Sequence, residues 1–330
     1  MARIIEVYDL ECMSNLFTYT GYDRTEDKWY QFVIHKTRND YLALMKHLFR
    51  SPLLMVGYNN LGYDYPLLHH LINHYDEYKT MDGATLASRF YQKSQEIIDM
   101  EFSVIADKNT RIPQLDIYKV HHWDNAAKAT SLKHCEMAMR MDNIEEMPFH
   151  HTYWVTTQDE IDKVLAYNKH DVRATNILLD YTVGKTNHAV YKNKNKIELR
   201  QLLSRSFNVN LLNHNDVKIG EDLVFKLYSE KAEVPQYILK KQRTLRPVIH
   251  LKDCIPNYVN FKTKIFNNIL AKWRNTSITS TKNAISEHII YHGMALDFGT
   301  GGLHGSNSGV FEVDDYWMII DADVGLKRLN

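Results

Sequence analysis

Residues 3–11, RIIEVYDLE, decide the fold at the start of the chain. The apolar pattern over residues 3–8 predicts a buried or half-buried strand that ends at the polar Asp9. Side chains alternate along a strand, so Asp9 and Glu11 face the same way. Taken alone, this acid pair favours the interpretation as a solvated strand end.

The neighbouring segments alternate between strand and helix patterns. Residues 52–58, PLLMVGY, predict a second strand, and the turn NNLG follows at 59–62. Apolar residues then recur at helical spacing from near Tyr63, namely Leu67, Leu68, Leu71 and Ile72. Residues 157–181 predict the clearest helix, which begins with a capping box of Thr157 and Glu160. This alternation predicts an α/β domain over residues 1–184.

The remainder of the chain changes character twice. Residues 185–290 predict a basic, mostly helical connecting region that begins with the polar segment KTNHAVYKNKNKIEL at 185–199. From residue 291 the pattern predicts β structure, with a glycine-rich stretch at 298–309 and a strand at 316–320, YWMII. We therefore expect three regions, 1–184, 185–290 and 291–330.

The charges of the chain are sorted by region. The 40 Lys and Arg residues balance the 40 Asp and Glu residues overall. Residues 185–275 nevertheless hold 18 basic against 7 acidic residues, residues 1–184 hold 19 against 26, and residues 276–330 hold 3 against 7. Such asymmetry indicates contact with nucleic acid or a membrane surface.

Composition narrows the class of protein. The chain shows no apolar run as long as the roughly 18 residues of a membrane span, and its acids begin too early for a signal peptide. Three scattered cysteines, Cys12, Cys135 and Cys254, are too few for a disulfide framework or a zinc site. We expect a reduced, cytoplasmic protein (the host cytosol if it is viral) without membrane contact.

Two further acids stand at ordered positions. Asp64 follows the second strand in the stretch NLGYD, where an acid can also simply stabilise a helix N-terminus. Asp171 lies four residues after Tyr167 in YNKHD, which puts both on one helix face. Either residue alone is compatible with a purely structural role.

Together, the D-x-E, N-x-x-Y-D and Y-x-x-x-D patterns resemble, in order and approximate spacing, the Exo I, Exo II and Exo III motifs of proofreading 3′–5′ exonucleases with four acids and a tyrosine. The resemblance implies a mixed-sheet domain of the ribonuclease H-like type. It also implies that Tyr167 positions the attacking water and that four acids bind two Mg²⁺ or Mn²⁺ ions: Asp9, which would bridge both, Glu11, Asp64 and Asp171. Hard cations of this kind prefer carboxylate oxygens.

Further residues match substrate-binding positions of this family. Asn60 and Tyr63 correspond to positions that hold the single-stranded primer end in related polymerases. Ser131 and Leu132, in SLKHC, resemble the (S/T)-L-x-x-h primer-binding motif of protein-primed phage polymerases. The same stretch is equally compatible with an ordinary helix start capped by Ser131. We interpret Asp116, in QLDIYK, as a structural residue.

The C-terminal region resembles the start of a family B DNA polymerase palm. TGGLHG at 300–305 resembles the Y-x-G-G segment, and IIDADV at 319–324 resembles the strand of polymerase motif A, with Asp323 as its metal-binding residue. Residues 325–330 lack the expected Ser, Tyr and Pro, and motifs B and C are absent. We therefore expect no polymerase activity from this chain alone, whether it is half of a split polymerase or an interrupted gene product.

Three functions follow from these observations. The leading one is a metal-dependent 3′–5′ exonuclease that proofreads single-stranded DNA ends and contacts primer-template DNA during replication. The second is a non-catalytic subunit that completes a separate polypeptide carrying the rest of the polymerase. An exoribonuclease with the same acids is the third, against which the polymerase-like C-terminal region argues.

Overall fold

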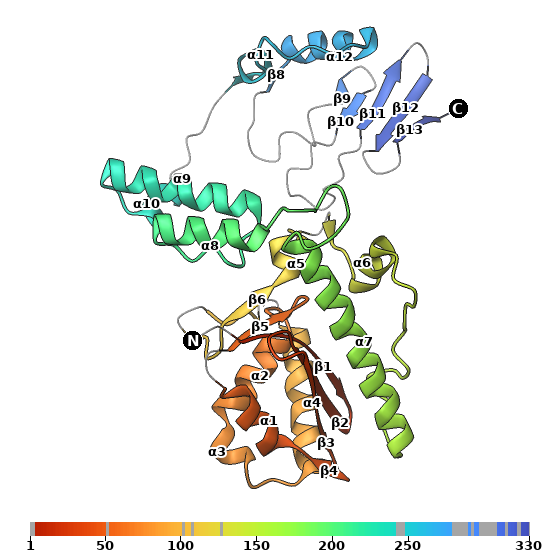
Figure 1. Cartoon of the computed structure of the whole chain (residues 1–330). Helices are drawn as coiled ribbons and strands as arrows, with labels where there is room; N and C mark the ends of the chain where they lie inside the picture. Colours follow the sequence, from red (N-terminus) through yellow and green to blue (C-terminus); the bar gives the residue numbers. More distant parts are fainter. Residues whose placement is uncertain are drawn as a thin grey trace. The chain divides into compact units, whose positions relative to one another are not determined.

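The computed structural model describes residues 4–50, 53–100, 103–106, 109–125, 128–241 and 248–278, and five strands between residues 290 and 329. The chain divides into two compact units. The first comprises residues 1–124 and 130–223, and the second comprises residues 125–129 and 224–330. Figure 1 shows the elements of both.

A six-stranded mixed sheet forms the centre of the first unit, in the order β4-β3-β2-β1-β5-β6. β1 pairs antiparallel with β2 and parallel with β5, and β5 pairs parallel with β6. The predicted α/β class is confirmed. The strands are β1 (Ile4–Met13), β2 (Leu16–Asp23), β3 (Lys28–His35), β4 (Arg38–Asn39), β5 (Leu53–Gly57) and β6 (Gln114–Asp116).

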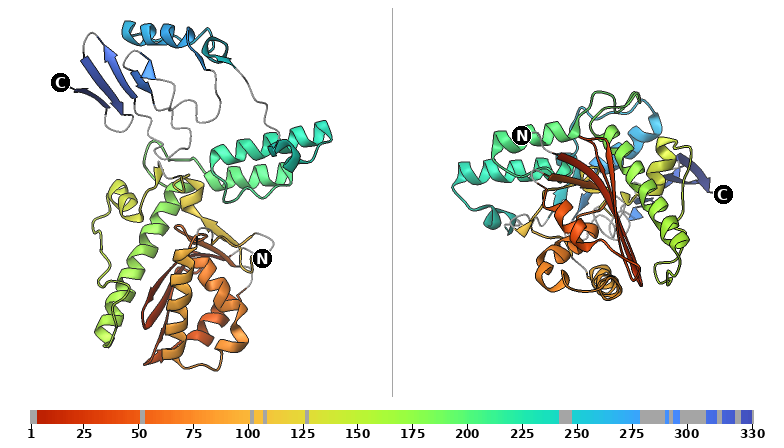
Figure 2. Two further views of the ribbon diagram at one scale, coloured as in Figure 1. Left: turned by 180° about the vertical axis from the view of Figure 1, so that it is seen from behind. Right: turned by 60° about the horizontal axis from the view of Figure 1, so that its bottom comes forward.

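Helices cover both faces of this sheet. α7 lies against one face of β1 and β2, and α1, α2 and α4 lie on the other (Figure 2). Gly83 lets α4 begin directly against the sheet, because a Cβ there would lie 2.2 Å from the carbonyl oxygen of His35. The helices of this unit are α1 (Tyr41–Leu48), α2 (Asp64–Asn73), α3 (Tyr75–Tyr78), α4 (Gly83–Asp99), α5 (Ile117–Val120), α6 (Leu132–Met139), α7 (Gln158–Thr182) and α8 (Lys196–Phe207).

The elements after α8 are mostly helical and then β, as the sequence predicts. α9 (Asp216–Ala232) contributes to both units. The later helices are α10 (Gln236–Lys241), α11 (Leu251–Cys254) and α12 (Lys264–Arg274), with a small ladder of β7 (Ile249–His250) and β8 (Ser277–Ile278). A five-stranded sheet follows, made of β9 (Ile290–Tyr291), β10 (Met294–Leu296), β11 (Gly309–Val313), β12 (Tyr316–Asp321) and β13 (Gly325–Leu329).

The predicted strand at 316–320 is therefore present as β12. Asp323 and the stretch 300–305 lie outside the described residues, so their polymerase-like roles stay predictions. The regional boundaries at 184 and 290 also stay predictions.

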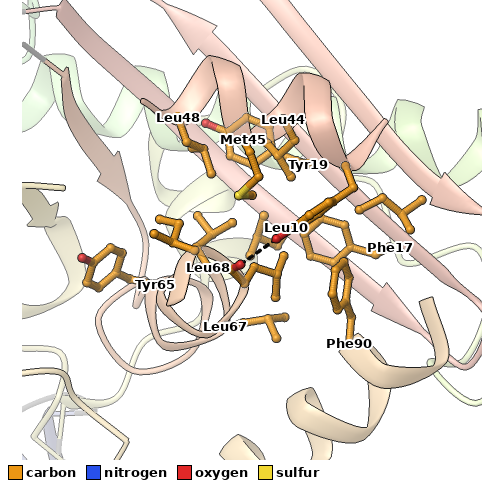
Figure 3. Close-up of a cluster of buried hydrophobic side chains, with 14 of the residues drawn as sticks. Leu10, Phe17, Tyr19, Leu44, Met45, Leu48, Tyr65, Leu67, Leu68 and Phe90 are labelled. Atoms are coloured by element: carbon orange, nitrogen blue, oxygen red, sulfur yellow. Dashed lines mark hydrogen bonds between the residues drawn. The ribbon is translucent and has the colours of Figure 1, made fainter. Parts of the chain in front are cut away.

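The alternation of side chains along β1 builds two different cores. Tyr8, Leu10 and Cys12 enter a cluster with the α1, α2 and α4 side chains shown in Figure 3. Val7 and Met13 point the other way, into two clusters that include residues of α7. β1 is thus buried on both faces.

One expectation about β1 is wrong. The strand does not end at Asp9 but continues to Met13, since its antiparallel pairing with β2 extends to the Met13–Leu16 pair. Burial of Leu10, Cys12 and Met13 holds this extension in place. Asp9 and Glu11 therefore lie within a central strand and not at its exposed end.

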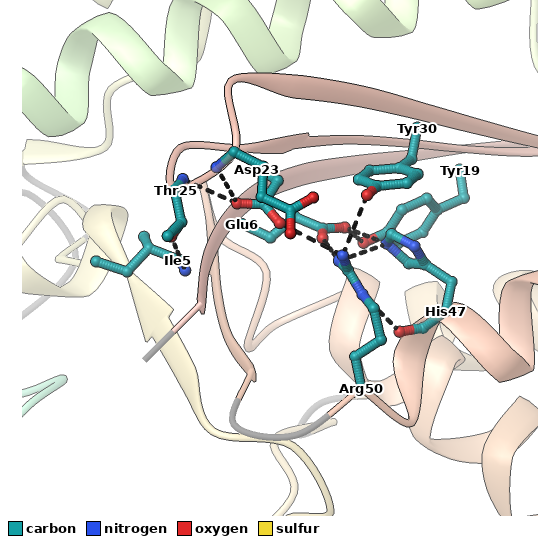
Figure 4. Close-up of polar contacts among 9 residues, drawn as sticks. Ile5, Glu6, Tyr19, Asp23, Thr25, Tyr30, His47 and Arg50 are labelled. Carbon is teal, nitrogen blue, oxygen red and sulfur yellow. Dashed lines mark hydrogen bonds and ion pairs between the residues drawn. The ribbon is translucent and has the colours of Figure 1, made fainter. Parts of the chain in front are cut away.

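Glu6 of β1 is fully buried and is neutralised from within the fold (Figure 4). Its carboxylate pairs with Arg50 and accepts hydrogen bonds from Tyr19 and His47, the latter at 2.7 Å. Arg50 also reaches Asp23 at the end of β2, at 3.3 Å. The network joins β1, β2 and the end of α1.

We predict that Arg50→Met destabilises the protein by about 3 kcal/mol, because it leaves the buried Glu6 and Asp23 carboxylates without their cation. The free energy of unfolding in urea measures this. Arg38→Met is the matched control, since Arg38 pairs with Asp40 at a side chain that is 43 % exposed, and its loss should cost less than about 1 kcal/mol. Equal losses in the two variants would contradict a structural role for the network.

Candidate active site

β1 and α7 bring three of the predicted acids together. Asp9 and Glu11 share the strand face that carries Val7 and Met13, so they point toward α7 between two apolar clusters. Carboxylate oxygens of Asp9, Glu11 and Asp171 all lie within 4.8 Å of one another. This spacing lets a cation bridge the strand and the helix.

The fourth acid, Asp64, belongs to the same electrostatic site. It is the first residue of α2 and is buried. Its negative charge contributes to the raised pKa values of both Asp9 and Glu11. The structure therefore groups all four predicted acids, although Asp64 is not part of the closest trio.

The carboxyl groups of this site are desolvated and have little positive charge nearby, so they hold their protons tightly. Desolvation and then the neighbouring carboxylates raise the pKa of Asp9 and of Glu11 well above the ordinary values. Desolvation also raises the pKa of Asp64 to about 7. A bound divalent cation would compensate this repulsion, which is the electrostatic argument for metal binding here.

Tyr167 contacts the site from α7. Its hydroxyl group interacts with the carboxylate of Asp171, one helical turn further along. Desolvation raises the pKa of Tyr167, so the hydroxyl stays protonated and can donate a hydrogen bond. The predicted Tyr167–Asp171 pair therefore forms one unit of the site.

Two residues of the site were not identified from the sequence. Asn168 donates a hydrogen bond of 2.6 Å to Asp9. Lys133 of α6 donates to Asp171 at 2.9 Å, and its ammonium group lies 4.7 Å from the centre of the Tyr167 ring. The position of Asn168 next to Tyr167 in the sequence could have identified it as a site residue. Lys133 lies 38 residues before its partner Asp171, and nothing in the local sequence indicates that pairing.

A buried pair of polar side chains, Glu136 and His170, lies next to Asp171. Glu136 of α6 is fully buried, and its carboxylate lies 3.0 Å from Nε2 of His170. Lys133 also reaches Glu136, at 3.4 Å. The group Glu136, His170 and Asp171 offers oxygen and nitrogen atoms close enough for a cation, but Lys133 and the imidazole already partner Glu136 there.

The turn before α2 is held from inside the protein. Asp116 accepts hydrogen bonds from the backbone N–H groups of Asn59, at 3.0 Å, and Leu61, at 3.1 Å. The side-chain amide of Asn60 is buried and donates to Gln114 at 2.9 Å. The hydroxyl groups of Tyr63 and Ser94 lie 2.6 Å apart.

These contacts fix the backbone that leads into Asp64. Asp116 has the structural role that we assigned to it. Asn60 and Tyr63 already have internal hydrogen-bond partners, and their predicted substrate contacts stay predictions.

Ser131 caps α6, as one of the two interpretations of SLKHC expects. Its hydroxyl oxygen accepts a hydrogen bond from the backbone N–H of His134, at 3.2 Å. Leu132 is partly buried and packs against the apolar cluster that contains Val7. The primer contacts predicted for Ser131 and Leu132 stay predictions, while the cap directs Lys133 and Glu136 toward α7.

We predict that stability falls as pH rises when metal is absent. A carboxyl group with a raised pKa holds its proton more tightly in the folded state, so its contribution is full below the unfolded pKa of about 4. The contribution is lost as the pH rises through the folded value, about 7 for Asp64. The thermal midpoint in EDTA should decrease as the pH is raised from about 5 to about 8. Added Mg²⁺ or Mn²⁺ should restore the midpoint most at the higher pH.

The double variant Asp9→Asn with Glu11→Gln should flatten this pH dependence and lose most of the metal response. Asp159→Asn is the control, because Asp159 lies on the same helix α7 with a side chain that is 75 % exposed. An unchanged metal response in the double variant would place the cation elsewhere.

Comparison with known proteins agrees with this arrangement. The model of the RNase H superfamily matches residues 5–183, which include β1, α2, α6 and α7. No curated protein matches the chain. None of the helices in the described part of the chain has the length and apolar character needed to cross a bilayer. The match covers more than half of the chain and contains the whole acidic site. The chain therefore belongs to the RNase H superfamily, whose fold and acidic clusters are those of metal-dependent nucleases.

Proposed function

We propose that the chain is a metal-dependent 3′–5′ exonuclease that removes nucleotides from single-stranded DNA ends, as the proofreading part of a family B DNA polymerase. The observation that carries the proposal is the joint placement of carboxylate oxygens of Asp9, Glu11 and Asp171 within 4.8 Å of one another, with Tyr167 beside Asp171 on α7. The order of the three motifs along the chain supports the exonuclease over other nucleases of this fold.

The donor set fits hard divalent cations. Asp9, Glu11, Asp64 and Asp171 would hold Mg²⁺ or Mn²⁺, because these ions prefer carboxylate oxygens. When bound, a pair of such ions activates the attacking water and stabilises the leaving 3′ oxygen in phosphodiester hydrolysis.

The chain's own residues would orient the reactants. Asn168 fixes the carboxylate of Asp9 by its 2.6 Å hydrogen bond. Tyr167 keeps its proton and can direct a water molecule beside Asp171. Lys133 supplies a positive charge at 2.9 Å from Asp171, which favours an approaching phosphate. The basic region 185–275 would contact the DNA backbone.

We expect Asp9→Ala with Glu11→Ala to abolish Mg²⁺-dependent shortening of a 5′-labelled oligonucleotide. Tyr167→Phe should lower kcat about tenfold to a hundredfold with little change in KM, since it removes a positioning hydroxyl group and no ligand. Asp159→Ala should retain parental activity. Degradation by the double variant at the parental rate would refute the site.

Matched DNA and RNA oligonucleotides test the substrate class in the same assay. Faster turnover of the DNA strand is expected. Preferential turnover of RNA would favour the exoribonuclease, and shortening from the 5′ end would exclude the proposed polarity.

A second candidate function, assembly with a separate polypeptide, is favoured by one surface of α9. Val217, Val224 and Tyr228 are 69 %, 66 % and 58 % exposed. Their spacing of seven and four residues puts them on one side of the helix. An exposed apolar stripe of this kind is typical of an interaction surface.

We propose that this stripe binds a polypeptide that carries the remaining polymerase motifs. Co-expression with the product of the neighbouring gene should give a complex in size-exclusion chromatography, and Val224→Ser should weaken it. Glu230→Ser, an exposed position on the opposite side of α9, should not. A chain that stays monomeric beside that product would count against assembly.

A further inference from the structure

A cavity of about 290 Å³ lies beside α6, on the side opposite the acidic site. Its wall includes Cys135 and Met139 of α6, Tyr181 of α7, and Tyr191 of the segment after α7. Lys133 and Glu136, which face Asp171, are three residues apart and lie on the other side of α6. α6 therefore separates the cavity from the acidic site.

Flat rings form much of the cavity wall. The rings of His121 and Trp123 stack at 4.6 Å with an interplanar angle of 15°. Tyr191 lies edge-on to Tyr181 at 5.6 Å and contacts His188 at 5.2 Å. Such surfaces accept a flat heterocycle by stacking, whatever its sequence identity.

The buried part of the cavity wall at His121 is uncharged, while a neighbouring segment is basic. Burial lowers the pKa of His121 to about 4, so its imidazole is neutral near pH 7. The segment that carries His188 and Tyr191 also carries exposed Lys185, Lys192 and Lys194 and has no acid between residues 185 and 197. A neutral ring pocket next to lysines matches a nucleotide, whose base is neutral and whose phosphate is anionic.

The cavity also lies within reach of a strand that ends at the acids. Tyr181 and Asp171 belong to the same straight helix and are ten residues apart in sequence, which is about 15 Å along the axis. The cavity volume is at the small end of ligand sites. It fits one base with its sugar and excludes a duplex.

We propose that this cavity is a subsite for one unpaired nucleobase, a few nucleotides inward from the 3′ end held at the acidic site. The inference rests on the proposed nuclease function for the direction of the strand. It assigns a specific task to α6, which would contact the reacting end with one face and an upstream base with the other.

The test measures binding by the full chain in EDTA, where no hydrolysis occurs. Fluorescence anisotropy with a 5′-labelled single-stranded oligonucleotide gives the Kd, and an abasic nucleotide is placed at each position in turn. One position near the 3′ end should weaken binding about tenfold when its base is removed.

Two variants change the cavity in opposite ways. Tyr191→Ala removes a ring from the wall, and Ala138→Phe fills the space from α6, where Ala138 lines the cavity. Each should weaken binding about tenfold and make the abasic substitution at the sensitive position silent, because the same contact is already lost. Met137→Phe is the matched control, since Met137 is 60 % exposed on the same helix and is not among the lining residues.

The outcomes separate the subsite from the nuclease. An abasic penalty of unchanged size in Ala138→Phe, or the absence of any sensitive position in the parent, would overturn the subsite. If Tyr191→Ala fails to fold, Ala138→Phe decides the question alone. Positional dependence in EDTA without shortening of the strand after Mg²⁺ is added would leave the subsite standing and refute the nuclease.

Discussion

The repulsion between carboxylates that lie half-buried at the β1–α7 contact is the constraint on which the rest of this unit depends. Asp9 and Glu11 interrupt an apolar strand face that otherwise packs through Val7 and Met13. One apolar cluster on each side of these acids keeps β1 and α7 together despite the charge. The fold thus stabilises a site that, without a cation, resists its own ionisation.

β1 carries acidic side chains on both faces, and their charges are compensated differently on the two faces. Glu6 faces α1 and is matched inside the protein by Arg50, Tyr19 and His47. On the opposite face, the described residues supply one nearby lysine, Lys133, and the amide of Asn168. Glu6 is fully paired within the protein and needs no external cation. The acidic site, in contrast, has more negative than positive charge. This contrast, within one strand, supports a structural role for Glu6 and a functional one for Asp9 and Glu11.

Local patterns were sufficient for the elements that carry the site. The capping box of Thr157 and Glu160 is present at the start of α7, with bonds of 3.2 Å and 3.0 Å. The leucines at 67, 68 and 71 are buried on α2 as their spacing predicts. The length of β1 was underestimated at the polar Asp9, although Tyr8, Leu10 and Cys12 alternate with Asp9 and Glu11 and so continue the strand pattern. Long-range pairings such as Lys133–Asp171 and Asn60–Gln114 depend on the folded arrangement and have no local signal.

The position of Lys133 shows why a short helix matters to the chemistry. α6 has only eight residues, and the Ser131 cap fixes where it begins. A shift of one residue would rotate Lys133 by about 100° around the helix axis and withdraw its charge from Asp171. The same rotation would carry Cys135 and Met139 away from the ring-lined cavity. The cap, the lysine and the cavity wall are therefore set by one helix register, which couples the charge balance of the acidic site to the surface that lies behind it.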